Sequence, residues 1–271
     1  MDKRFLIIAR VGDESCHPSW LSQAHPEFDL FLNYYGDVPE KFKNQATFYE
    51  QQKGGKWAIT GELVEQYWEL IHTYDAVWFP DDTVLTNAQV INRMFALFQG
   101  HQLLLAQPAL TLESYLTQPA QLQQSAYHLR YVNRIDLVAP LMSREALMTL
   151  TPTFSQTANG LGLDRCWPEL INNRSHDKIA IIDDTPVTVT RPTQNQGYNS
   201  SAKQSSPCDV AREPISDSKC DNNGEACNAH FRVYRCLVKK GSNGKLASLL
   251  RAKWQQLRSK LRAIFSKRYP S

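Results

Sequence analysis

The chain has 271 residues, of which 42% are hydrophobic and 10% aromatic, so it is long enough to bury a substantial core. Its net charge is only +3, but residues 231–271 hold twelve Lys and Arg and no Asp or Glu, so the remainder is net acidic. No window approaches eighteen apolar residues, which excludes a predicted membrane span.

The N-terminal sequence predicts a strand and not a signal peptide. The apolar run at residues 5–11 is short and is interrupted by Arg10. The six Cys form no Cys-x-x-Cys pair, and nothing suggests secretion, so we expect reduced thiols and a cytoplasmic protein.

Strand and helix patterns alternate through the first half of the chain. Apolar, β-rich runs predict strands at 5–11, 28–35, 74–80 and 103–106, and later at 135–139 and 178–182. Helical spacing appears at 62–73 and again after Asn87, a residue that caps helices, with Gly100 as the stop. Alternation of this kind predicts an α/β domain with a largely parallel sheet.

Two adjacent carboxylates, Asp81 and Asp82, follow the predicted strand at 74–80. A parallel strand that ends in paired acids places them at the sheet edge where open α/β sheets bind ligands. Carboxylate oxygens suit Mg²⁺ or Mn²⁺ and the phosphates these ions carry. The alternative is a solvated Pro-Asp-Asp turn without a ligand.

Residues 193–230 differ in composition from the rest. They are rich in Ser, Asn, Gln and Asp and lack hydrophobic periodicity, so we expect a flexible polar linker. The segment and its neighbours contain four Cys and one His that form a weaker zinc alternative, because their spacing fits no common zinc pattern; they are Cys208, Cys220, Cys227, His230 and Cys236.

Residues 231–271 form the basic C-terminal segment and predict an amphipathic helix. An apolar stripe that includes Leu250, Trp254 and Leu257 is flanked by Lys and Arg. Such a helix can lie on an anionic membrane surface, which would make the protein peripheral at the membrane. It can equally dock on its own domain or pair with a second copy. Nucleic acid is the weakest alternative, because the tail has too few aromatic residues for base stacking, and we expect no nucleic-acid partner.

Seven motifs in a fixed order then resemble a known family. They are FDLFLNYYGD (28–37), KGGKW (53–57), WFPDDT (78–83), LLAQPAL (104–110), LRYVNRIDLVAPLMSREAL (129–147), GLGLDRCWPEL (160–170) and IAIIDDTPVTVTRP (179–192). This order resembles the glycosyltransferase-like family named domain of unknown function 707, over residues 4 to 192. The resemblance implies a GT-A fold, a Rossmann-like α/β sandwich of the nucleotide-diphospho-sugar transferase superfamily, at 1–192.

The resemblance also implies roles for single residues. Asp82 would hold Mn²⁺ or Mg²⁺ against the diphosphate of a nucleotide sugar, and Asp164 would deprotonate the acceptor hydroxyl. The residues implied in donor binding are Arg10, Asp13, Asp81, Asp82 and Arg191; those implied in binding a glycan or other hydroxyl acceptor are Trp167 and Arg134. Structural alternatives stand beside these roles: Asp164 as a helix cap, Trp167 as core, Asp183 and Asp184 as a strand end, and His17 as a solvated loop residue.

Two positions depart from the family pattern. Thr83 stands where a third acid is usual, and Val189 where His is usual. A neutral hydroxyl is a weak ligand for these ions and Val offers none. Either Asp82 takes over the ligand role, or the reaction runs without metal, or catalysis has been lost. Leu161 also replaces a common Trp, which reduces the implied acceptor platform.

Three functions follow from these patterns. The first is a glycosyltransferase that moves a sugar from a nucleotide donor to a hydroxyl acceptor. The second is a catalytically inactive module that binds a nucleotide sugar or glycan, which Thr83 and Val189 favour. The third is another phosphate-handling enzyme, such as a nucleotidyltransferase or hydrolase. Fold analogy alone does not decide among them.

Overall fold

The structure is a computed structural model that describes residues 4–115, 118–156, 160–171, 176–192 and 231–239. The predicted linker at 193–230 and the predicted basic helix beyond residue 239 lie outside these residues. So do Cys208, Cys220, Cys227 and His230 of the zinc alternative.

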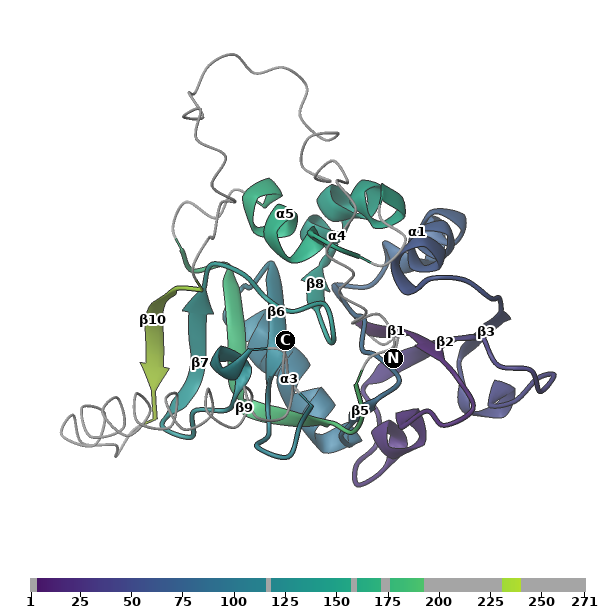
Figure 1. Cartoon of the computed structure of the whole chain (residues 1–271), viewed down its shortest axis with the longest axis horizontal. Coiled ribbons are helices and arrows are strands. Elements are labelled where there is room, and N and C mark those ends of the chain that lie inside the picture. Colours follow the sequence, from purple (N-terminus) through teal and green to yellow (C-terminus); the bar gives the residue numbers. More distant parts are fainter. Residues whose placement is uncertain (1–3, 116–117, 157–159, 172–175, 193–230, 240–271) are drawn as a thin grey trace, which may run out of the picture.

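A mixed, mostly parallel sheet forms the centre of the fold, with helices on both sides (Figure 1). Its strands lie in the order β10-β7-β9-β6-β8-β4-β1-β2-β3. The strands are β1 (Phe5–Val11), β2 (Phe28–Tyr34), β3 (Phe48–Gln51), β4 (Ala76–Trp78), β6 (Leu105–Leu110), β7 (Tyr127–Val132), β8 (Leu141–Ser143), β9 (Ile179–Val189) and β10 (Val233–Val238), and the short β5 (Val84–Leu85) pairs with β9 off this order. The α/β class with a largely parallel sheet is confirmed.

The central strand β1 explains the two-sided core. All seven of its residues are buried, and it pairs in parallel with both β2 and β4. Because successive side chains point to opposite faces, Ile7 and Ala9 pack into one apolar cluster while Leu6 and Ile8 pack into the other. Such a strand needs a nearly continuous apolar sequence, which FLIIARV provides apart from Arg10.

Each cluster is closed by its own helices. On one side lie α1 (Lys56–Gln66), α2 (Trp68–Ile71), α4 (Arg144–Leu150) and α5 (Leu163–Leu170); on the other lies α3 (Ala88–Gly100) (Figure 1). Helix α3 begins as predicted, because the Asn87 side chain accepts a hydrogen bond from the Val90 N–H at 3.0 Å. The Ser143 hydroxyl caps α4 in the same way.

Several predicted elements are wrong in extent or type. The helix expected at 62–73 begins earlier, at Lys56, and is interrupted at Tyr67. The strand expected at 178–182 continues through Asp183 to residue 189, because a distant arginine neutralises that buried acid.

The strand expected at 135–139 is not formed. Side chains take its backbone N–H groups: that of Asp136 donates to the Gln107 side chain, and that of Val138 donates to the Asp136 carboxylate. The carbonyl of Val138 in turn accepts from the Asp81 N–H, so this segment runs along the end of β4 without joining a ladder.

The basic C-terminal segment is not helical at its start. Residues Val233–Val238 form β10, which pairs antiparallel with β7 at one edge of the sheet. This part of the segment expected to be a separate helix therefore extends the α/β domain. Among the described residues, no helix has the length and apolarity needed to cross a bilayer.

Candidate functional site

A polar cavity of about 180 Å³ lies outside the carboxyl ends of β1 and β4. The chain runs from β1 to β2 and β3 on one side and returns to β4 on the other, so the strand order reverses between β1 and β4. Open α/β sheets bind ligands in the crevice at such a reversal. The lining residues are Arg10, Tyr35, Gly54, Gly55, Lys56, Asp81, Asp82, Thr83, Arg191 and Pro192.

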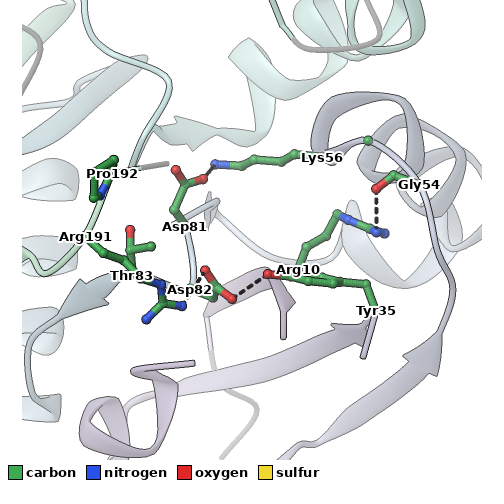
Figure 2. A pocket seen from close by; sticks show the side chains of 10 residues that line it. Arg10, Tyr35, Gly54, Lys56, Asp81, Asp82, Thr83, Arg191 and Pro192 are labelled. Carbon is green, nitrogen blue, oxygen red and sulfur yellow. Dashed lines mark hydrogen bonds and ion pairs between the residues drawn. The ribbon is translucent and has the colours of Figure 1, made fainter. Parts of the chain in front are cut away.

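Arg10 enters the cavity from β1 and is 7% exposed. Its guanidinium donates to the Asn33 side chain at 2.5 Å and to the Gln52 carbonyl at 3.2 Å. It also donates to the Gly54 carbonyl at 2.9 Å (Figure 2). Burial lowers the pKa of Arg10 to about 10, which leaves it charged at neutral pH. Arg10 therefore holds in place the glycine loop, Gly54 and Gly55, which leads into α1.

Asp82, in the loop after β4, contacts the residues that follow β1 and β2 at the same edge. Its Oδ2 accepts from the Gly12 N–H at 2.9 Å and from the Tyr35 hydroxyl at 2.7 Å, and its Oδ1 is 3.4 Å from Arg191 (Figure 2). A Cβ at Gly12 would lie 2.7 Å from the Tyr35 hydroxyl, so only glycine lets this ring reach Asp82. Burial raises the pKa of Tyr35, so the phenol stays protonated and donates.

Asp81 pairs with Lys56, the first residue of α1. The Lys56 Nζ is 2.5 Å from Asp81 Oδ1, and the two side chains are only 13% and 15% exposed. Burial raises the pKa of the Asp81 carboxyl, and the ammonium opposes that rise. Figure 2 shows the Lys56 side chain extending to Asp81 across the cavity.

The donor and metal residues predicted from the sequence are thus mostly in one place. Arg10, Asp81, Asp82 and Arg191 all line the cavity. Asp13 does not: its exposed carboxylate accepts from the Tyr34 hydroxyl at 2.6 Å and pairs with Lys41 at 2.8 Å.

Asp164 and Arg134 lie near each other outside this cavity. Asp164 is in the first turn of α5, 3.8 Å from the Arg134 guanidinium. Burial raises the pKa of Asp164, and Arg134 opposes the rise. The negative charge of Asp136 raises the pKa of both Asp164 and Asp81, so Asp136 lies near each of them.

The proposed role of Trp167 in stacking on an acceptor sugar is wrong. The side chain is 0% exposed and packs edge-on against Trp57, with ring centroids 4.9 Å apart, and beside Phe154. Its indole N–H donates to the Thr153 hydroxyl at 2.9 Å. A residue packed on all sides cannot offer a ring face to a ligand.

Two further expectations for polar residues are wrong. His17 is not solvated but buried, with its ring against Trp20 and Phe42. Burial lowers its pKa to about 4. Asp183 does not end a strand; it lies inside β9 and holds the buried Arg130.

Residues that sequence reasoning did not assign include Lys56, Tyr35 and Gly54. The signal for Lys56 was the Gly54-Gly55 pair directly before a helix, a pattern that brings backbone close to a ligand at a helix start. The signal for Tyr35 was its position at the carboxyl end of β2. Gly54 has a φ of +142°, a backbone conformation that residues other than glycine rarely adopt.

The donor set does not fit a divalent cation. Such ions need several oxygen ligands at short range. Here both carboxylates are engaged by protein donors, and Thr83 offers only a neutral hydroxyl. Val189 is 1% exposed and pairs with Val84. Among the described residues, no group of three or more His, Cys, Asp or Glu side chains is placed to hold a metal ion.

No protein family model matches the chain, and neither does any curated protein. Membership of the domain of unknown function 707 therefore stays a prediction. Solved structures with a similar fold include S. aureus TarS residues 1–349, alone (13% identity, 68% of this chain and 59% of that chain, TM-score 0.45) and in complex with UDP-GlcNAc (14%, 74% and 62%, 0.46).

A candidate nucleotide-diphospho-sugar transferase from Desulfovibrio desulfuricans G20 is a third (13% identity, 68% of this chain and 80% of that chain, TM-score 0.40). The chain spans about three fifths of the TarS fragment. Similarity at this level does not define the activity of the chain.

Proposed function

We propose that the chain is a glycosyltransferase that binds a nucleotide sugar at the cavity and transfers the sugar to a hydroxyl acceptor. The observation that carries this proposal is the cavity itself, which lies at the strand-order reversal and gathers Arg10, Lys56 and Arg191 around two acids. This is the position where nucleotides bind open α/β sheets. Its cations suit the diphosphate that links nucleoside to sugar.

The leaving group explains why cations are needed. When the acceptor oxygen bonds to the anomeric carbon, the bond from that carbon to the diphosphate oxygen breaks, and the electron pair leaves with the nucleoside diphosphate. Positive groups fixed near the departing oxygen stabilise this charge as it develops. Arg191, which is about one-third exposed and carries a planar fork of donors, suits this role.

The acceptor must lose its hydroxyl proton in the same reaction. We assign that proton to the Asp164 carboxylate, because burial raises its pKa towards the range of a useful general base. Arg134, 3.8 Å away, would hold the carboxylate in position and limit the rise.

A second candidate function is a catalytically inactive module that binds nucleotide sugars. The burial of Val189 favours it, because Val189 stands where the family that the chain resembles usually has a metal-binding His, and this side chain packs in the core. The predicted contact of the C-terminal segment with an anionic membrane surface would be compatible with either function.

The test is turnover of UDP-, GDP-, ADP- and CDP-sugars by the full chain, measured as release of nucleoside diphosphate with and without candidate hydroxyl acceptors. We expect release with one nucleotide class. Asp164→Asn should lower the rate by about 10²- to 10⁴-fold, as loss of a general base does, without changing affinity for the nucleotide sugar. Glu169→Gln, an exposed acid on the same helix, is the matched control.

Binding of a nucleotide sugar without release of nucleoside diphosphate would contradict the proposed enzyme activity and favour the inactive module. A full rate in Asp164→Asn would remove that residue as the base. Release of sugar 1-phosphate in place of nucleoside diphosphate would indicate the nucleotidyltransferase or hydrolase alternative.

A further inference from the structure

The ammonium group of Lys56 lies in a cage of three oxygen atoms. It is 2.5 Å from Asp81 Oδ1, 3.0 Å from the Leu137 carbonyl and 3.1 Å from the Phe79 carbonyl. An ammonium has three N–H donors, so all of them are used. The position that a cation would take at Asp81 is therefore already held by a cation of this chain.

The second acid is engaged in the same way. Asp82 accepts hydrogen bonds from Gly12 and Tyr35 and lies 3.4 Å from Arg191. A divalent ion that bound both acids would have to displace Lys56 from Asp81 and the donors from Asp82. It would then lie beside the two cations Lys56 and Arg191, which like-charge repulsion opposes.

The charge of the cavity favours an anion. Its lining includes three cationic side chains, Arg10, Lys56 and Arg191, and two anionic ones, Asp81 and Asp82. The net charge is thus one positive before any ligand arrives. Taken together, these five side chains attract a diphosphate and repel a free divalent cation.

One polar group of the lining still lacks a partner. The Thr83 hydroxyl is buried, with the residue 4% exposed, and has no hydrogen-bond partner among the described residues. A hydroxyl can donate to a phosphate oxygen, and burial without a partner costs about 1–3 kcal/mol. Thr83 stands where a third acid would bind metal, and its chemistry suits a phosphate oxygen better.

We infer that this site binds the diphosphate without a divalent cation. This inference rests on the function proposed above. Lys56 supplies the fixed positive charge at Asp81 where a metal ion would otherwise sit. Arg191 and Thr83 contact the phosphate oxygens. Arg10 holds the glycine loop in place beside them.

The test is isothermal titration of the full chain with inorganic pyrophosphate and with UDP, GDP, ADP and CDP, first in EDTA and then in excess Mg²⁺ or Mn²⁺. We expect binding in EDTA, with an affinity within about threefold of that with metal, because no metal bridge is lost. Arg191→Gln should weaken binding by about tenfold to a hundredfold, as for a lost hydrogen bond to a charged group. Neither Arg191→Gln nor the comparison of wild-type binding with and without metal requires a substitution at Lys56.

Lys56→Met should also weaken binding in EDTA by about tenfold or more, since it removes the fixed charge. Lys53→Ala is its matched control: this exposed lysine lies three residues earlier and pairs with Asp37, outside the cavity lining. It should leave binding unchanged.

Binding that appears only with Mg²⁺ or Mn²⁺ would overturn the metal-free inference and leave the nucleotide-sugar function standing. Binding in EDTA that Arg191→Gln does not weaken would overturn the assignment of the phosphate contact. No binding of pyrophosphate or any nucleoside diphosphate, with or without metal, would overturn both this inference and the proposed function.

Discussion

The molecule contains two sets of ion pairs between basic side chains and aspartates, and the two sets differ in their burial. Arg130 and Asp183 are 1% and 0% exposed and meet through two hydrogen bonds, at 2.8 and 3.0 Å. Arg130 also donates to the carbonyls of Ala120 and Leu122, and Asp183 also accepts from the Gln124 N–H. This pair joins β7, β9 and the loop between β6 and β7, and solvent does not reach it.

The cavity pairs are less enclosed. Lys56 and Asp81 are 13% and 15% exposed, and Arg191, paired with Asp82, is 35% exposed. The comparison teaches that complete burial marks a structural pair, whereas partial exposure at a strand-order reversal marks a pair available to a ligand. The predictions below test that distinction.

The largest effect is expected from the buried pair. Arg130→Met leaves Asp183 as an uncompensated buried carboxylate, and breaking a buried pair in this way costs about 3–5 kcal/mol. We expect the free energy of unfolding in urea to fall by that amount. A loss of about 1 kcal/mol or less would contradict the structural role of the pair.

His17 is a buried group near the cavity, and among the described residues no carboxylate hydrogen-bonds to its ring. Its pKa is about 4 in the folded chain, against 6.5 ordinarily, so the unfolded chain binds a proton first as pH falls. Stability should therefore be complete above pH 6.5 and decrease between about pH 6.5 and 4, by up to about 3 kcal/mol.

The measurement is urea unfolding across this pH range for the wild type and His17→Phe. The variant should lose that part of the pH dependence. An unchanged slope in His17→Phe would contradict the assignment of the titration to His17.

The Asn87 cap belongs to neither set of ion pairs, so its loss shows how much one ordinary hydrogen bond contributes to stability. Asn87→Ala removes the cap of α3 and should lower the free energy of unfolding by about 1 kcal/mol, as cap losses usually do. Asn87→Ser, which keeps a capping oxygen, is the control and should recover most of the loss. Equal losses in both variants would show that the cap is not the cause.

The smallest effect on stability is expected at the cavity. Arg191→Gln should change the free energy of unfolding of the ligand-free chain by less than about 0.5 kcal/mol. The reason is that the side chain is partly exposed and its distance to the Asp82 carboxylate, 3.4 Å, is long for an ion pair. The same variant should lose most of the rise in melting temperature that a nucleoside diphosphate causes in the wild type. A loss of stability comparable to that of Arg130→Met would remove the distinction between the two sets.

Much of the fold could be predicted because local patterns decide it. The apolar run of β1, the acids after β4 and the Asn87 cap depend on neighbouring residues, and each was placed correctly. Four of the five residues that the family resemblance implied in donor binding line one cavity, and Asp13 does not.

The errors arise where distant segments decide the outcome. Asp183 lies inside β9 only because Arg130, 53 residues earlier, neutralises it. Trp167 is core because Trp57 and Phe154 cover it, and the sequence of a short helix does not show which face will be covered. The Lys56 cage uses a carbonyl from residue 137, which no local pattern relates to residue 56.

The central claim is that a nucleoside diphosphate binds at the cavity with Lys56 in the place of a metal ion. The most direct measurement is a crystal structure of the full chain with the tightest-binding nucleoside diphosphate, grown with Mn²⁺ and examined by anomalous scattering. We predict phosphate oxygens within hydrogen-bond distance of Arg191 and Thr83, the Lys56–Asp81 pair intact, and no manganese peak. A manganese ion between Asp81 or Asp82 and the phosphates, or a diphosphate bound away from this cavity, would contradict the account.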